Sequence, residues 1–95
     1  MKERFFKQSE GFVEQNVGDE TILVPLVDSV AQMNEVITLN ELGTFIYNLL
    51  KELMSFDELL KRVLDEYDVS EKDATEDLNN FLKSALEKKI IFERD

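Results

Sequence analysis

The chain has 95 residues, of which 43% are hydrophobic and 34% charged, and this length and composition support one small hydrophobic core. It contains neither Cys nor His, which excludes disulfides, thiolate nucleophiles, imidazole bases and zinc sites built from those ligands. The formal net charge of −10 argues against nucleic acid as a partner, because proteins that bind it neutralise phosphates with Lys and Arg.

Residues 1 to 10 carry mixed charges around Phe5 and Phe6 and follow no clear hydrophobic period. Because chain ends of this kind are often poorly ordered, we expect a flexible N-terminal arm. A docked or exchanged strand is the alternative. Residues 11 to 95 are expected to form a single domain.

Two strands are predicted next, at about residues 12–17 and 20–26. Gly18-Asp19 separates them and is typical of a two-residue hairpin loop with positive φ at its first position. The side chains of Ile22, Val24 and Leu26 alternate along the second strand, so we expect them to face the core.

A third strand, at about residues 35–38, is predicted to lie at a sheet edge and to lead directly into a helix. Thr38-x-x-Glu41 has capping-box spacing, which places the helix start at Thr38, give or take two residues. Apolar residues then recur at three- and four-residue steps through about residue 52. Gly43, in the first turn, is expected to permit close helix packing.

Two more helices are predicted, at about residues 56–67 and 71–88. Ser55-x-x-Glu58 has capping-box spacing and Ser70-x-x-Asp73 starts the third helix in the same way. The last residues are expected to be a tail packed on the core. The whole pattern predicts an α+β fold, a three-stranded antiparallel sheet followed by three α-helices. Its expected core includes Phe45, Leu60, Leu64, Leu78 and Phe81.

No catalytic machinery, cofactor site or metal site is expected. The three glycines are too far apart to form a phosphate loop, and most acids of the second and third helices fall opposite the apolar stripes. The longest apolar run has six residues, Ile22 to Val27, against about 18 for a membrane span. We therefore expect no membrane contact and a cytoplasmic location.

The edge strand beside the third helix is the feature that predicts a function. An edge carries unpaired N–H and C=O groups, and an extended peptide can pair with them while its alternate side chains enter an adjacent apolar groove. The alternative is that the C-terminal tail or the N-terminal arm covers this edge.

Several short strings resemble the PqqD family, which is named for a member in pyrroloquinoline quinone biosynthesis and belongs with the peptide-recognition elements of ribosomal peptide modification. The most specific is Ile37-Thr38-Leu39-Asn40-Glu41-Leu42-Gly43, similar to the family's strand-to-helix segment. Glu66-Tyr67-Asp68-Val69-Ser70 is similar to its turn, and Asp77-Leu78-Asn79-Asn80-Phe81-Leu82 to its third helix. The resemblance covers about residues 11 to 90.

This resemblance implies a winged-helix-like fold without catalysis of its own. It also implies that the leader segment of a precursor peptide adds to the third strand, packs against the third helix and is delivered to a modifying enzyme, often a radical SAM protein. We expect a monomer or a homodimer, the latter including a swapped form. The expected peptide-binding residues are Glu35, Val36, Ile37, Thr38, Asp77, Leu78, Phe81 and Leu82.

A second hypothesis is a regulatory winged-helix or helix-turn-helix domain that binds DNA or a protein through the third helix. A recognition helix normally presents Arg, Lys, Asn or Gln in its N-terminal half. This helix presents four acids there, Glu71, Asp73, Glu76 and Asp77. A partner that docks on them should therefore be neutral or basic at its contacting end.

Overall fold

The computed structural model describes residues 3–26 and 36–94. The elements of these residues are β1 (Phe5–Gln8), β2 (Phe12–Val17), β3 (Glu20–Pro25), β4 (Ile37–Leu39), α1 (Glu41–Leu49), β5 (Met54–Ser55), α2 (Phe56–Glu66), α3 (Glu71–Glu87) and β6 (Ile91–Arg94). The expected run of three strands followed by three helices is confirmed as β2-β3-β4-α1-α2-α3. No helix among these residues is long and apolar enough to cross a membrane.

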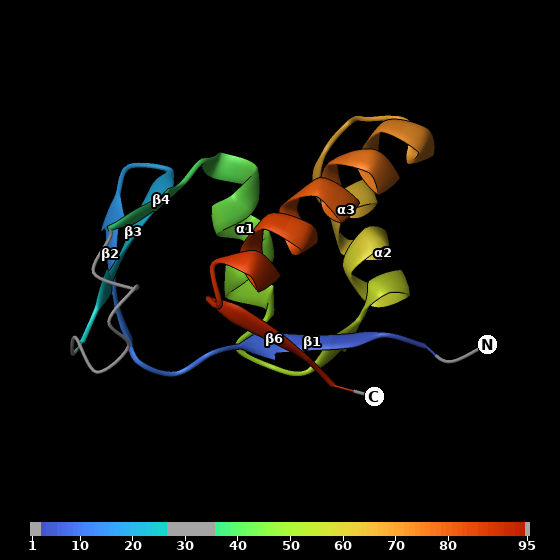
Figure 1. Ribbon diagram of the computed structural model, residues 1–95. Helices are drawn as coiled ribbons and strands as arrows, with labels where there is room; N and C mark the ends of the chain where they lie inside the picture. Colours follow the sequence, from blue (N-terminus) through green and yellow to red (C-terminus); the bar gives the residue numbers. More distant parts are fainter. Residues whose placement is uncertain (1–2, 27–35, 95) are drawn as a thin grey trace.

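Strands β2, β3 and β4 form an antiparallel sheet in that order, with β4 at one edge as predicted. The hairpin between β2 and β3 turns at Gly18, whose φ of 62° confirms the expected left-handed position. Figure 1 shows this sheet on one side of α1, with α2 and α3 on the other.

The buried face of β3 is the opposite of the one expected. Thr21 and Leu23 are fully buried, whereas Leu26 is 60% exposed. Thr21 pairs with Leu39 and Leu23 with Ile37, and all four side chains lie on the face that packs on the helices. Because side chains alternate strictly along a strand, a shift of one residue moves the whole set to the other face. The prediction for Ile22, Val24 and Leu26 was therefore wrong.

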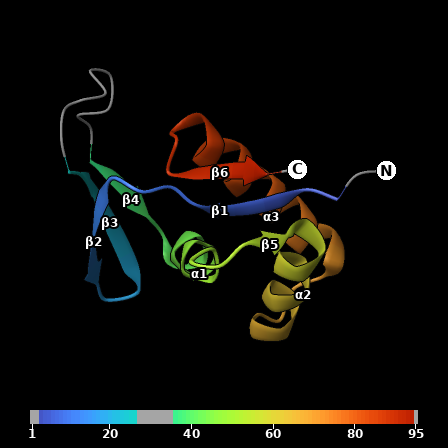
Figure 2. The ribbon, with the colours of Figure 1, turned by 90° about the horizontal axis from the view of Figure 1, so that it is seen from below.

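A second sheet, β5-β1-β6, is formed by segments that the sequence patterns left without a regular structure. β1 pairs antiparallel with β6 over four residues, from Phe5↔Arg94 to Gln8↔Ile91. The two strands run side by side beneath the helices (Figure 2). The predicted C-terminal tail is thus a strand, and its first residue, Ile91, is buried.

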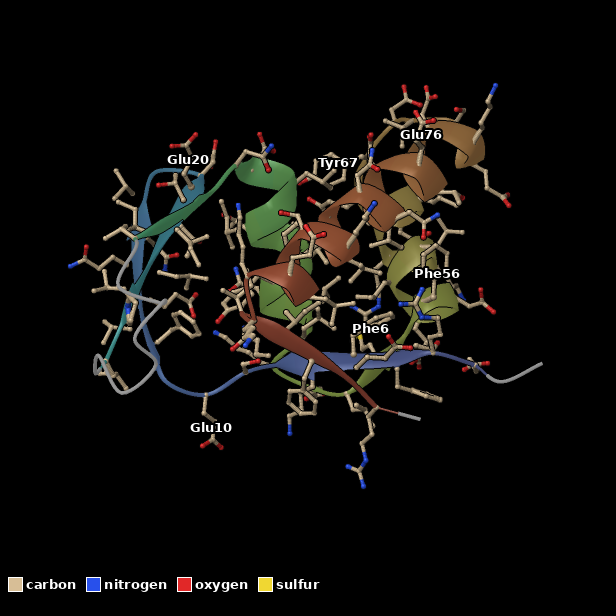
Figure 3. The ribbon with its side chains drawn as sticks, viewed as in Figure 1. Phe6, Glu10, Glu20, Phe56, Tyr67 and Glu76 are labelled. Atoms are coloured by element: carbon tan, nitrogen blue, oxygen red, sulfur yellow. The ribbon has the colours of Figure 1, made fainter. Side chains whose placement is uncertain are left out.

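Residues 5–8 differ from the expected loose arm because Phe6 belongs to the core. Its side chain is 0% exposed and points from β1 toward the helices (Figure 3). The alternative of a docked strand describes this segment. Arg4 adds an exposed ion pair to Glu93, with an Nε–Oε2 distance of 2.8 Å.

The starts of two helices follow the predicted capping chemistry. Ser55 and Glu58 form a complete capping box at α2, and the Ser70 side chain accepts a hydrogen bond from the Asp73 amide at α3. The start of α1 differs, because Asn40 caps the helix in place of Thr38. This shift lies within the expected two residues.

Candidate functional site

The β4 strand leaves one of its two edges without a backbone partner among the described residues. It pairs with β3 on one side only, and none of the other described residues makes a backbone hydrogen bond to Ile37 or Thr38. The segments expected as possible covers, the N-terminal and C-terminal strands, pair with each other instead. The edge therefore stays open in the described part of the chain.

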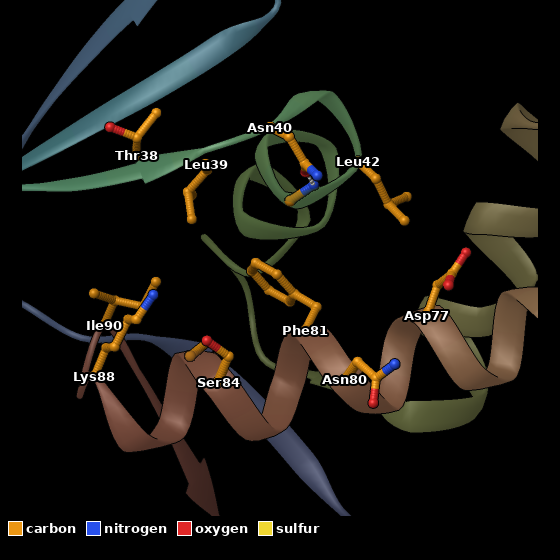
Figure 4. Close-up of a pocket in the computed structure, with 12 residues that line it drawn as sticks. Thr38, Leu39, Asn40, Leu42, Asp77, Asn80, Phe81, Ser84, Lys88 and Ile90 are labelled. Atoms are coloured by element: carbon orange, nitrogen blue, oxygen red, sulfur yellow. Dashed lines mark hydrogen bonds between the residues drawn. The ribbon is translucent and has the colours of Figure 1, made fainter.

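A groove runs between β4, the start of α1 and one side of α3, with a volume of ≈ 510 Å³ (Figure 4). Its lining residues are Thr38, Leu39, Asn40, Leu42, Gly43, Asp77, Asn80, Phe81, Ser84, Ala85, Lys88 and Ile90. The groove thus borders the strand and the helix that the sequence singled out.

The floor of the groove is apolar and its rim is polar. Leu39, Ala85 and Ile90 are buried beneath it, while Asp77 and Lys88 are exposed at its margin. A floor of this kind offers hydrophobic contact to side chains that enter from above, and a polar rim stays compatible with solvent.

The start of α1 forms one wall, and its shape depends on Asn40 and Gly43. The Asn40 side chain accepts a hydrogen bond of 2.8 Å from the Gly43 amide. A Cβ atom on Gly43 would lie 3.1 Å from Cε1 of Phe81, closer than most such contacts. The absence of a side chain therefore lets the Phe81 ring lie against the first turn of α1, which confirms the expected close packing.

Helix α3 presents two neighbouring stripes with different roles. Asp77, Phe81, Ser84 and Lys88, spaced by three or four residues, line the groove, as one side of a helix should. A second stripe of Ala74, Leu78, Leu82 and Ala85 is buried in the core. Ala85 belongs to both, because it lies at their boundary.

The structure divides the predicted peptide-binding residues into three groups. Thr38, Asp77 and Phe81 line the groove. Val36 is 56% exposed just before β4, and Ile37 is a buried residue of that strand. Leu78 and Leu82 lie in the core and do not line the groove, while Glu35 lies outside the described residues.

Sequence reasoning missed several groove residues, among them Asn80, Ser84 and Lys88 of α3. Their positions relative to Asp77 are i+3, i+7 and i+11, so the helical period could have identified them once Asp77 was chosen. Leu39 and Ile90 carried no such signal, because they reach the groove from β4 and from the turn before β6.

A second depression of ≈ 390 Å³ lies near the β2–β3 turn and includes Asp19, Glu41, Phe45 and Tyr67. Phe45 and Tyr67 meet edge to face with ring centroids 5.5 Å apart. Burial, followed by the charges of Glu41, Glu66 and Asp19, raises the pKa of Tyr67. This depression takes one residue, Asn16, from β2, the other edge strand of the sheet, and none from α3. No group of three or more acids suited to a metal ion occurs among residues 3–26 and 36–94.

Comparisons with known proteins agree with this geometry. The family described as "Coenzyme PQQ synthesis protein D (PqqD)" matches residues 20–91. The solved structure "TbiB1 in Complex with the TbiA(beta) Leader Peptide" is similar with a TM-score of 0.74 and 27% identity, over 90% of this chain and 93% of that one. "Lasso peptide synthetase B1 complexed with the leader peptide" is similar in fold, with a TM-score of 0.73 and 18% identity over 92% and 96% of the chains. No curated protein matches this chain.

Proposed function

The chain belongs to the PqqD family, and from this premise we propose that it is a non-catalytic peptide-binding chaperone. It captures the leader segment of a ribosomally made precursor peptide by strand addition and presents it to a modifying enzyme, such as a radical SAM protein, in the cytoplasm. The similar TbiB1 structure contains a leader peptide by its description, which supports the same class of ligand here.

The observation that carries this proposal is the open edge of β4 above a groove with an apolar floor. The leader backbone continues the β2-β3-β4 sheet by pairing with that edge. Its alternate side chains point into the groove, where Leu39, Phe81 and Ile90 contact them. Backbone pairing supplies affinity, and the groove supplies specificity.

The alternative of DNA binding through α3 has no comparable support. The first turns of α3 carry Glu71, Asp73, Glu76 and Asp77, which repel phosphates. In the proposed complex, the peptide contacts α3 on the side that carries the groove-lining residues.

The proposal is tested by NMR titration of the isotope-labelled protein with a synthetic leader segment taken from a precursor encoded beside its gene. We expect chemical-shift changes at residues 36–42 and 77–90. Shifts concentrated on the exposed side of α2, around Lys61 and Asp65, would show that strand addition is not the mode of binding.

Two N-methylated versions of the same leader provide a sharper control that leaves the protein unchanged. Successive amides of a strand point to opposite edges, so one peptide is methylated at odd and the other at even positions. One of them should lose binding and the other should keep most of it. Equal effects of the two patterns would contradict strand pairing.

A further inference from the structure

The groove carries opposite charges at its two ends. Lys88 lies beside Ile90, across the groove from Thr38 at the end where β4 begins, and Asp77 lies toward Leu42, at the end where β4 has passed into α1 (Figure 4). Phe81 lies between them. Since β4 runs from the lysine end toward the aspartate end, it is antiparallel to α3.

Both charges are available to a ligand. Asp77 and Lys88 are exposed, and the ion pair found within the described residues joins Arg4 and Glu93, at another part of the molecule. The other groove residues, Asn80 and Ser84 among them, are neutral. Asp77 and Lys88 are therefore the charged side chains that line this groove.

We propose that the groove selects a peptide strand by charge order: a basic residue toward the peptide's N-terminus lies beside Asp77, and an acidic residue toward its C-terminus lies beside Lys88. This inference rests on the proposed strand addition. It takes the added strand to be antiparallel to β4, like the other pairs of this sheet, which is the slightly more stable arrangement.

The geometry also sets the spacing of the two peptide charges. Asp77 and Lys88 are separated by about 16 Å along the α3 axis, at 1.5 Å rise per residue. An extended strand covers this distance in about five residues at roughly 3.3 Å each. Because side chains on one face are separated by an even number of positions, spacings of about four and six fit best.

The neighbouring charges do not cancel this polarity. Glu76 precedes Asp77 and strengthens the negative end, although it does not line the groove. Lys89 follows Lys88 and strengthens the positive end, against Glu87 on its other side. The effect of the helix dipole is confined to the first and last turns, so it does not reach Asp77 in the second turn. At Lys88, the C-cap of α3, the negative end of the dipole offsets part of the positive charge and leaves its sign unchanged.

The experiment uses two synthetic peptides that differ only in charge order. Each has a strand-forming core of alternating Thr and Val. The first peptide carries Lys followed by Glu about four positions later. The second carries Glu at the first of these positions and Lys at the second. Their dissociation constants are measured by NMR titration, which also locates the bound peptide. The wild-type protein should bind the Lys-first peptide more tightly, by roughly fivefold at low salt, and the ratio should approach one in about 1 M salt.

Matched variants test which residues of the protein recognise the order of charges in the peptide. The exchange Asp77→Lys with Lys88→Glu leaves the net charge unchanged and should reverse the preference. Asp77→Asn with Lys88→Gln should abolish it, and this milder pair guards against a folding defect at the end of α3. As a control, Lys61→Glu with Asp65→Lys exchanges charges on the exposed side of α2, outside the groove, and should leave the wild-type preference in place.

The outcomes separate this inference from the proposed function. If both peptides bind at β4 and α3 with equal affinity, the charge order is wrong and strand addition stands. A wild-type preference for the Glu-first peptide would overturn the antiparallel placement and thus the proposal as stated. If neither peptide shifts the resonances of β4 or α3 while the leader segment does, this inference fails and strand addition stands. If the leader segment also leaves them unchanged, strand addition fails and the inference fails with it.

Discussion

At the scale of single residues, Gly43 and Phe81 together set the width of the groove. Glycine is unfavourable inside a helix by about 0.5–1 kcal/mol relative to alanine. Here its lack of a side chain leaves room for the Phe81 ring, because an added Cβ would lie 3.1 Å from that ring and 3.2 Å from the capping oxygen of Asn40. Gly43 thus lowers the intrinsic stability of α1, and its missing side chain leaves room for the ring that forms one wall of the groove.

Gly43→Ala should change binding more than stability. The helix gains propensity, the crowded Phe81 ring moves toward the open groove, and we expect the two effects on unfolding to cancel to within about 1 kcal/mol. Peptide affinity should fall because the displaced ring narrows the groove. Urea unfolding and NMR titration check both parts, and unchanged affinity would show that Gly43 does not shape the site.

Tyr47 makes stability depend on pH in the alkaline range. Burial, followed by the charge of Glu14, raises the pKa of Tyr47 from 10.0 to about 12. The folded state therefore favours the neutral phenol. This contribution to stability is complete below pH 10 and is lost as the pH rises through the folded pKa. Urea unfolding between pH 9 and about 12 should show a smaller loss in Tyr47→Phe than in the wild type; equal losses would mean that another group governs this range.

At the scale of elements, α3 serves the core with one stripe and the groove with the next. Leu78 is 0% exposed, whereas Phe81 is only partly buried and lines the groove. The prediction that Phe81 is a core residue is therefore corrected, because its ring is only partly buried and contacts solvent on the groove side. The two positions separate stability from binding.

Leu78→Ala should lower the free energy of unfolding by about 2–5 kcal/mol, since it leaves a cavity among packed neighbours. Phe81→Ala should cost less than about 3 kcal/mol, because its groove side is already open, but it should weaken peptide binding strongly. Denaturant unfolding and titration of both variants provide the comparison. A larger stability loss for Phe81→Ala would mean that the ring is a core anchor after all.

At the scale of the whole molecule, the two ends of the chain complete the structure. β1 is the central strand of β5-β1-β6, and the side chain of its Phe6 is fully buried in the core. Because β1 and β6 pair with each other, neither occupies the free edge of β4. The second sheet thus contributes to stability and leaves the edge of β4 open among the described residues.

Phe6→Ala should lower the free energy of unfolding by about 3–5 kcal/mol, as for other buried aromatic residues. Glu93→Gln breaks the ion pair to Arg4. Because the Arg4 side chain is 51% exposed and the Glu93 side chain 31% exposed, the change should lower the free energy of unfolding by no more than about 1 kcal/mol. Thermal and denaturant unfolding measure both. A small effect of Phe6→Ala would favour the flexible arm that composition suggested.

The sequence by itself determined the elements whose signals are local. The capping box of Ser55 and Glu58, the turn at Gly18 and the apolar periods of the helices depend only on residues a few positions apart. These signals predicted the order of three strands and three helices, and they placed β4 at a sheet edge. The resemblance carried by Ile37 to Gly43 pointed to the PqqD family, which the match over residues 20–91 confirms.

The tertiary structure decided what depends on contacts between distant segments. The inner face of β3 was set by its register with β4, which alternation alone cannot specify because both faces carry apolar residues. The strands β1 and β6 exist through pairing between opposite ends of the chain, and such pairing leaves no local period. For the same reason, Leu39 of β4 and Ile90 of the turn before β6 meet Asp77 and Lys88 of α3 in one groove only after folding.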